Sequence, residues 1–236
     1  DASCSLYDMD IFNSRLRNER KLPPNTVRVI FEEGSFTPAY AVTETSRGSR
    51  IVHGKDSEGF WQELLSFEMP GGSLVPAIAD KDGKTVYAVD DRAGVNQAVV
   101  KVNRNLENPE LIYQHSSTDV MYVHSDINRE VYGLEFGVGK RELFFLKPEH
   151  PDAKTLKALQ KVFPNSDVNI VDSAARGRLL VVAERSDIAP TTYYLFNRDT
   201  NQLQYLTSTR SWVDATKSSP TEEFRFTARD GLELTG

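Results

Sequence analysis

The chain has 236 residues, 39% hydrophobic and 26% charged, which is the ordinary range for globular proteins and predicts a buried core rather than disorder. The formal net charge is −6 and the basic residues are interspersed with acids, which argues against a nucleic-acid partner. Cys4 is the single cysteine, so an intrachain disulfide and any metal site built on several cysteines are excluded.

The first 25 residues have a mixed pattern. Residues 6–12 are apolar enough to predict a strand, whereas residues 15–21 are polar and charged and are interpreted as a solvated turn. Pro23 and Pro24 then forbid regular structure.

From Thr26 onward, short alternating segments separated by polar turns predict strands that group into four units. The first unit has its strands at residues 26–32, 39–45, 51–53 and 61–67. The second has them at 74–79, 85–89, 98–102 and 110–115, with Asp80 to Gly83 as a turn. The third has them at 120–124, 130–136 and 141–146, and the fourth at 168–171, 179–183, 191–196 and 203–207.

The third unit departs from the scheme in its last quarter. Leu156, Leu159 and Phe163 fall at i, i+3 and i+7, and Pro151 and Asp152 stand where a helix start favours them. This spacing predicts one short amphipathic helix over residues 151–163, inserted in place of a fourth strand.

The units are in phase along the chain. Corresponding positions in the second strands lie 45 and 48 residues apart, and those in the fourth strands lie 47 and 94 residues apart. These positions are Val86, Val131 and Leu179, and Leu64, Leu111 and Tyr205. A four-stranded unit with this repeat predicts an all-β chain of about four β-propeller blades, part of a larger propeller. A β-sandwich or meander with accidental spacing is the alternative. An open arc of blades would expose blade edges and favour homo-oligomers.

The end of the chain leaves this pattern. Residues 210–220 are rich in Ser, Thr and Asp and predict a linker after a propeller portion at residues 1–209. Residues 221–236 alternate on both sides of Asp230 and Gly231, which predicts a hairpin. Because a lone hairpin is marginal, we interpret it as the first element of a further domain whose remainder is absent.

No complete catalytic constellation is present. No serine stands in a G-x-S-x-G elbow, and the segment from Gly137 to Lys140 fails the P-loop spacing. The turn at Asp80 to Gly83 has only the beginning of a calcium loop. The four histidines lack a metal-ligand spacing, and an approach of His115 to His124 within a blade is the one pairing that we expect. They are His53, His115, His124 and His150. We therefore predict no catalytic residue, metal or cofactor in this chain, and no substrate-binding residue can be named.

Several motifs resemble the end of the propeller in prolyl oligopeptidase family proteins, most closely the acylaminoacyl-peptidase and dipeptidyl-peptidase branch. They are the run from Tyr193 to Arg198, Asn201 to Leu203, Arg210 to Trp212, and Phe226 to Leu232. The segment from Asp82 to Tyr87 resembles the family's blade motif, and Ser211 replaces the family's usual proline.

The resemblance implies a serine peptidase whose propeller caps the active site and filters short peptides by size. The catalytic triad would lie in an α/β-hydrolase domain beyond Gly236. The function hypothesis is therefore a non-catalytic, substrate-gating propeller whose partners are peptide substrates and its own hydrolase domain. The alternatives are a stand-alone propeller that binds a protein or glycan, and the propeller of a non-peptidase esterase.

The sequence leaves the compartment open. No run of about 18 apolar residues predicts a membrane span, and no signal peptide pattern is visible. The chain starts at Asp1 rather than Met, so an upstream targeting segment could have been removed. For that reason the cytoplasm and the periplasm are both kept as expected compartments.

Overall fold

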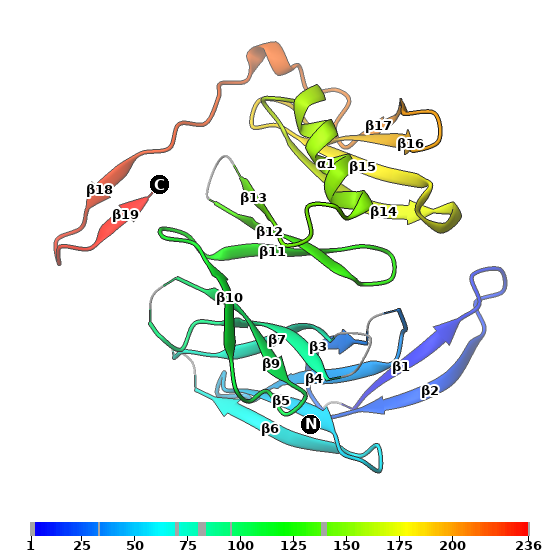
Figure 1. The fold of residues 1–236 in the computed structure, drawn as a ribbon, viewed down its shortest axis with the longest axis vertical. Helices are drawn as coiled ribbons and strands as arrows, with labels where there is room; N and C mark the ends of the chain where they lie inside the picture. Colours follow the sequence, from blue (N-terminus) through cyan, green and yellow to red (C-terminus); the bar gives the residue numbers. More distant parts are fainter. Residues whose placement is uncertain are drawn as a thin grey trace. The chain divides into compact units, whose positions relative to one another are not determined.

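A computed structural model describes residues 3–32, 34–68, 71–79, 84–94, 96–137 and 141–235. The chain forms two compact units (Figure 1), one of residues 1–120 with 128–130 and one of residues 121–127 with 131–236. The predicted turn at Asp80 to Gly83 lies outside the described residues, and so does the predicted turn at Gly137 to Lys140 except for Gly137 itself. The motif from Asp82 to Tyr87 is described only from Lys84 onward.

The first unit contains two four-stranded antiparallel sheets, and in each sheet neighbours in the sequence are neighbours in space. The first sheet is β3 (Thr26–Phe31), β4 (Pro38–Glu44), β5 (Arg50–Lys55) and β6 (Trp61–Phe67). The second is β7 (Leu74–Ala79), β8 (Thr85–Asp90), β9 (Ala98–Asn103) and β10 (Glu110–Gln114). Their inner residues share one apolar core that includes Tyr40, Val52, Leu74, Val86 and Val100.

The N-terminal segment corrects the sequence prediction. Residues 15–21 are not a turn: they belong to β2 (Leu16–Leu22), which pairs antiparallel with β1 (Cys4–Met9). The charged side chains of β2 pair with those of β1, since Arg20 contacts Asp8 at 3.0 Å. A two-stranded ribbon exposes both faces, so a polar strand is tolerated there and carries no apolar alternation. The predicted strand over residues 6–12 ends early at Met9 because Asp10 opens the turn.

The second unit begins with the sheet in which a helix was predicted. Its strands are β11 (Val120–Ser125), β12 (Val131–Phe136) and β13 (Glu142–Phe145), and they are followed by α1 (Pro151–Val162). Within the described residues this sheet has three strands, and α1 follows where the fourth would stand, as predicted. Ala153, Leu156 and Leu159 on α1 are buried against Val168, Leu180 and other apolar residues.

The last four-stranded sheet joins α1 in one apolar core. Its strands are β14 (Asp167–Ala174), β15 (Leu179–Arg185), β16 (Thr192–Asn197) and β17 (Gln202–Ser208), and a short 3₁₀ turn η1 (Ala175–Gly177) connects the first two. After β17 come the 3₁₀ turn η2 (Ala215–Lys217) and the hairpin of β18 (Arg225–Thr227) and β19 (Glu233–Thr235), in which Phe226 lies opposite Leu234. The assignment of this hairpin to a further domain stays a prediction.

The sheets confirm the predicted fold class. Each is an antiparallel meander of consecutive strands, the arrangement of a β-propeller blade. The phase of the sequence repeat has a structural basis, because Val86 and Val131 are both buried at the start of the second strand of their sheets. Among the described helices, none is long and apolar enough to cross a membrane.

The core beneath α1 is expected to carry much of the stability of the second unit. Leu156→Ala removes a side chain with no solvent exposure and leaves a cavity, so we expect a loss of about 2–5 kcal/mol in the free energy of unfolding. The matched control on the same helix is Val162→Ala, at a position that is 62% exposed, and it should change this free energy by less than about 0.5 kcal/mol. Urea unfolding followed by circular dichroism measures both; equal effects would show that α1 does not pack as described.

Candidate functional site

The four histidines of the sequence occupy four different environments. His53 on β5 lies 3.0 Å from the Thr43 hydroxyl, and burial lowers the pKa of its imidazole. The Nδ1 atom of His115 accepts hydrogen bonds from the backbone N–H groups of Ser117 and Thr118 and so organises a turn after β10. The expected approach of His115 to His124 is not tested, because the two residues belong to different units.

His124 belongs to a buried charged network in the second unit. Its Nε2 atom lies 2.8 Å from Oε2 of Glu135, and both side chains are 2% exposed. The other carboxylate oxygen of Glu135 accepts a hydrogen bond from Nη1 of Arg141. Arg141 also approaches Asp167 at 3.4 Å, so that His124, Glu135, Arg141 and Asp167 form one continuous chain of polar contacts.

Asn169 on β14 completes the surroundings of Glu135. With its amide nitrogen turned toward the carboxylate, Nδ2 donates to Oε2 of Glu135 at 3.2 Å and to the backbone oxygen of Val168 at 2.9 Å. In the same orientation its oxygen accepts from Arg185 at 2.8 Å. The Glu135 carboxylate is therefore bonded by donors from three different segments, around β11, β13 and β14.

These bonds decide the protonation state of Glu135. Burial alone would raise the pKa of its carboxyl group, but the hydrogen bonds and positive charge of His124 and Arg141 lower it to about 2. The carboxylate is thus ionised across the physiological pH range and holds its donors in place.

A histidine bonded to a carboxylate makes up two of the three members of a hydrolytic triad. The third member would be a serine or cysteine nucleophile beside the histidine. Within the described residues, His124 contacts Glu135 and the rings of Tyr122 and Tyr132, at 4.9 and 5.9 Å between ring centroids. None of these groups is an activated hydroxyl or thiol nucleophile. In this arrangement the network can hold the strands that carry His124, Glu135 and Asn169 together and can fix the orientation of the His124 ring.

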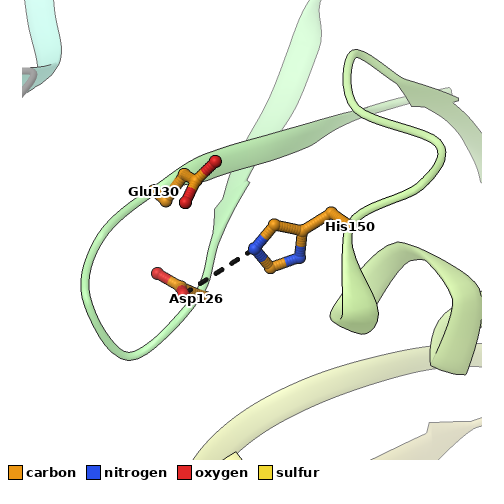
Figure 2. A group of neighbouring side chains, drawn as sticks. All are labelled: Asp126, Glu130 and His150. Atoms are coloured by element: carbon orange, nitrogen blue, oxygen red, sulfur yellow. Dashed lines mark ion pairs between the residues drawn. The ribbon is translucent and has the colours of Figure 1, made fainter.

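A second group lies at the β11–β12 turn and the start of α1. Figure 2 shows Asp126 and Glu130 on the two sides of this turn and His150 directly before α1. One ligand atom from each of the three lies within 4.8 Å of the others. Nε2 of His150 is 3.7 Å from Oδ2 of Asp126, and Tyr132 stacks on the His150 ring at 5.0 Å with an interplanar angle of 8°.

Such a group could suggest a metal site, but the tautomer of His150 argues against one. Nδ1 of His150 accepts a hydrogen bond from the backbone N–H of Asp152 at 3.1 Å. A neutral imidazole that accepts at Nδ1 carries its proton on Nε2, the nitrogen that faces Asp126. A cation there would have to displace that proton, and the ring could not move it to Nδ1 without losing the bond to Asp152.

A polar depression lies between the β5–β6 and β9–β10 turns of the first unit. Charges of both signs line it, from Lys55, Asp56, Glu58 and Arg104. Oδ1 of Asp56 is already occupied by the backbone N–H groups of Glu58 and Phe60. This balance of charge and the local use of Asp56 give the depression no evident ligand preference.

The sequence did not single out Glu135, Arg141 or Asp126. A glutamate inside an apolar strand is a weak signal by itself, because its partners come from segments 11 residues before it and 6 and 34 residues after it. The sequence signal for His150 is its place directly before Pro151, because proline favours the first helical position and the residue before it is then the N-cap.

The fold defines the class of the protein: a chain built of β-propeller blades. No protein-family model matches the sequence, and no curated protein does. Among solved structures, the chain resembles a puromycin-hydrolyzing peptidase of Mycobacterium tuberculosis with a TM-score of 0.51 and 10% identity, over 99% of this chain and 40% of that one.

Two further structures are similar at lower scores. A prolyl endopeptidase has a TM-score of 0.48 and 13% identity over 83% of this chain and 30% of its own. TolB from Acinetobacter baumannii has a TM-score of 0.45 and 15% identity over 87% of this chain and 49% of its own. At such identities the likeness establishes the fold alone. The chain spans 30 to 49% of the length of these three structures.

The buried network gives a test by substitution. Glu135→Gln leaves the buried His124 without its carboxylate partner and takes from Arg141 one of its two carboxylates, so we expect a loss of about 3–5 kcal/mol in the free energy of unfolding. The matched control is Glu44→Gln, which removes an ion pair with Arg50 whose side chains are 40% and 44% exposed and should cost less than about 1 kcal/mol. Urea unfolding compares the two; a Glu135 effect as small as the control would contradict the network.

The same carboxylate predicts an acid limit to stability. The folded-state pKa of Glu135 is about 2, below the ordinary value of 4.5, so its stabilising contribution is complete above pH 4.5 and is lost as the pH falls through 2. The difference in unfolding free energy between the wild type and Glu135→Gln should therefore not decrease from pH 7 to 5 and should shrink below pH 4.5. A difference that already declines near pH 6 would show that Glu135 is not held ionised by its donors.

Proposed function

We propose that this chain is the substrate-gating propeller portion of a serine peptidase of the prolyl oligopeptidase kind, in its acylaminoacyl-peptidase and dipeptidyl-peptidase branch. The full-length protein would hydrolyse short peptides, with the catalytic residues in an α/β-hydrolase domain that follows this chain. The propeller itself would be non-catalytic. The fold similarity to a peptidase over 99% of this chain supports the proposal.

The observation that carries the proposal is the order of elements at the end of the chain. Tyr193 to Phe196 lie on β16 of the last sheet, and the Arg210 to Trp212 motif follows β17. The Phe226 to Leu232 motif forms the β18–β19 hairpin with Gly231 at a φ of 86° in its turn. This is the order in which the resembled family passes from its last blade to its hydrolase domain.

The hairpin also has the surface of an element that needs a neighbour. Phe224, Phe226 and Leu232 are large apolar side chains with 59%, 47% and 59% exposure, and the first two stack at 5.9 Å. A two-stranded hairpin with exposed aromatic residues is marginal by itself and is stabilised by joining a larger sheet. A following domain would supply that sheet.

The segment before the hairpin is held to the last sheet. The backbone N–H of Thr209 donates to the oxygen of Thr191 at 3.0 Å, and the N–H of Thr221 donates to Oδ2 of Asp187 at 2.6 Å. These two attachments, at Thr209 and Thr221, are 12 residues apart in the sequence, so the segment between them cannot move far from the last sheet. A short, tethered connection suits a propeller that has to stay over an active site.

The test compares the whole native protein with this chain. The protein that contains this sequence is purified from its natural source and treated with a serine-directed fluorophosphonate, beside the 236-residue chain produced alone. We expect labelling of a native protein well above 26.6 kDa and none of the isolated chain. The labelled protein should cleave short peptides, and longer peptides should be cleaved progressively more slowly.

Each of the other results rejects the proposal in a distinct way. A native protein of 26.6 kDa that is not labelled would favour a stand-alone binding propeller. A labelled protein that cleaves esters but no peptides would favour an esterase. Labelling of the 236-residue chain itself would show that it is catalytic.

A further inference from the structure

The start of α1 depends on the side chain of His150. Pro151 occupies the first helical position and has no backbone N–H, so the N–H of Asp152 is the first donor that the helix leaves without an intrahelical partner. Nδ1 of His150 accepts this donor at 3.1 Å. Histidine thus performs the capping role that Ser, Thr, Asp or Asn performs in most helices, with a ring nitrogen that can take up a proton.

Both ring nitrogens of His150 favour the same neutral tautomer. Nδ1 must be unprotonated to accept from Asp152, and Nε2 carries the proton toward Oδ2 of Asp126 at 3.7 Å. The ring cannot easily escape to solvent, since its side chain is 10% exposed and lies flat on Tyr132 at 5.0 Å.

We propose that His150 is an acid-sensitive cap of α1, which holds the first helical turn while the ring is neutral and releases it when Nδ1 takes up a proton. A protonated Nδ1 is a donor and would face the backbone N–H of Asp152, which is also a donor. The two cannot bond, so the ring or the first turn of the helix has to move.

The charges around the ring act in both directions. Asp126 and Glu130 on the β11–β12 turn and Asp152 on α1 favour the imidazolium. Arg198, which pairs with Asp152, and the positive end of the helix dipole oppose it. Tyr132, which stacks on His150, also contacts His124, with 5.9 Å between the ring centroids of Tyr132 and His124. Lys154 on α1 is paired with Glu149 at 2.8 Å.

Protonation therefore exchanges one interaction for another. The imidazolium gains attraction to Asp126 through Nε2 while the helix loses its acceptor at Nδ1. The loss is local, because Ala153 and Leu156 remain buried in the core beneath α1. The expected result is a loosened first turn on an otherwise folded helix.

The experiment follows the ring and the helix in the ¹⁵N-labelled 236-residue chain by NMR between pH 8 and 5. At pH 8 the ring spectra should show His150 protonated at Nε2 and not at Nδ1. As His150 titrates, the protection of the Asp152 amide against hydrogen exchange should fall roughly fivefold after correction for intrinsic exchange, the typical effect of losing an N-cap.

Two substitutions separate the cap from its surroundings. His150→Asn keeps a side-chain acceptor at the N-cap and does not titrate, so the pH dependence of Asp152 protection should disappear. His115→Asn is the matched control, because His115 also accepts backbone N–H groups at Nδ1 but in a turn without a following helix. It should leave the behaviour of Asp152 unchanged.

Three results would overturn the proposal. The first is a His150 ring protonated at Nδ1 at pH 8, which the wild type reports even if a variant fails to fold. The second is Asp152 protection that stays constant through the titration or keeps its pH dependence in His150→Asn. The third is a change of the His150 ring signals on addition of EDTA, which would mean that the ring holds a metal ion.

Discussion

An ionised carboxylate without solvent contact is the constraint on which the second unit depends. Glu135 points into the interior from the middle strand of its sheet, and transfer of such a charge from water costs several kcal/mol unless donors replace the water. The donors are His124, Arg141 and Asn169, which belong to different segments. Because hydrogen bonds are directional and apolar contacts are not, these bonds add a geometric constraint on the strands that apolar packing alone does not supply.

The helix α1 is the second feature that distinguishes this unit. Where a blade would add an outer strand, α1 places Leu156 and Leu159 against the apolar side chains of the last sheet. It also introduces a buried acid, Asp152, which Arg198 neutralises from the β16–β17 turn. The helix therefore joins the last two sheets through both apolar packing and an ion pair, which a fourth strand bonded only to β13 would not do.

The regular parts of the fold were predictable from the sequence because they depend on local alternation. Strands such as β8 and β15 bury every second side chain or nearly so, and polar turns mark their ends. The helix was predictable because a proline start and an i, i+3 spacing coincide. The strand β2 was missed because a two-stranded ribbon has no buried face and so leaves no period in the sequence.

The candidate site was less predictable for a different reason. Strand β12 is buried at every position, so alternation gives no sign of which side chain faces a partner. The partners of Glu135 come from other strands, and their meeting depends on the tertiary arrangement rather than on spacing in the sequence. Asp126 and His150 are likewise brought together by the turn and the helix start, 24 residues apart in the chain.

His124 and His150 show how the surroundings of a residue type decide what it can do. Both imidazoles lie beside the ring of Tyr132, at centroid distances of 5.9 and 5.0 Å, and each has a carboxylate near Nε2. His124 faces a carboxylate at 2.8 Å that two further donors hold fixed, so that movement of the ring would leave this buried carboxylate with one donor fewer. Nε2 of His150 faces Asp126 at 3.7 Å, and Nδ1 accepts a single backbone N–H, that of Asp152. Protonation of Nδ1 would remove this hydrogen bond. The first histidine is therefore part of the rigid frame of the unit, and the second is the place where that frame can respond to acid.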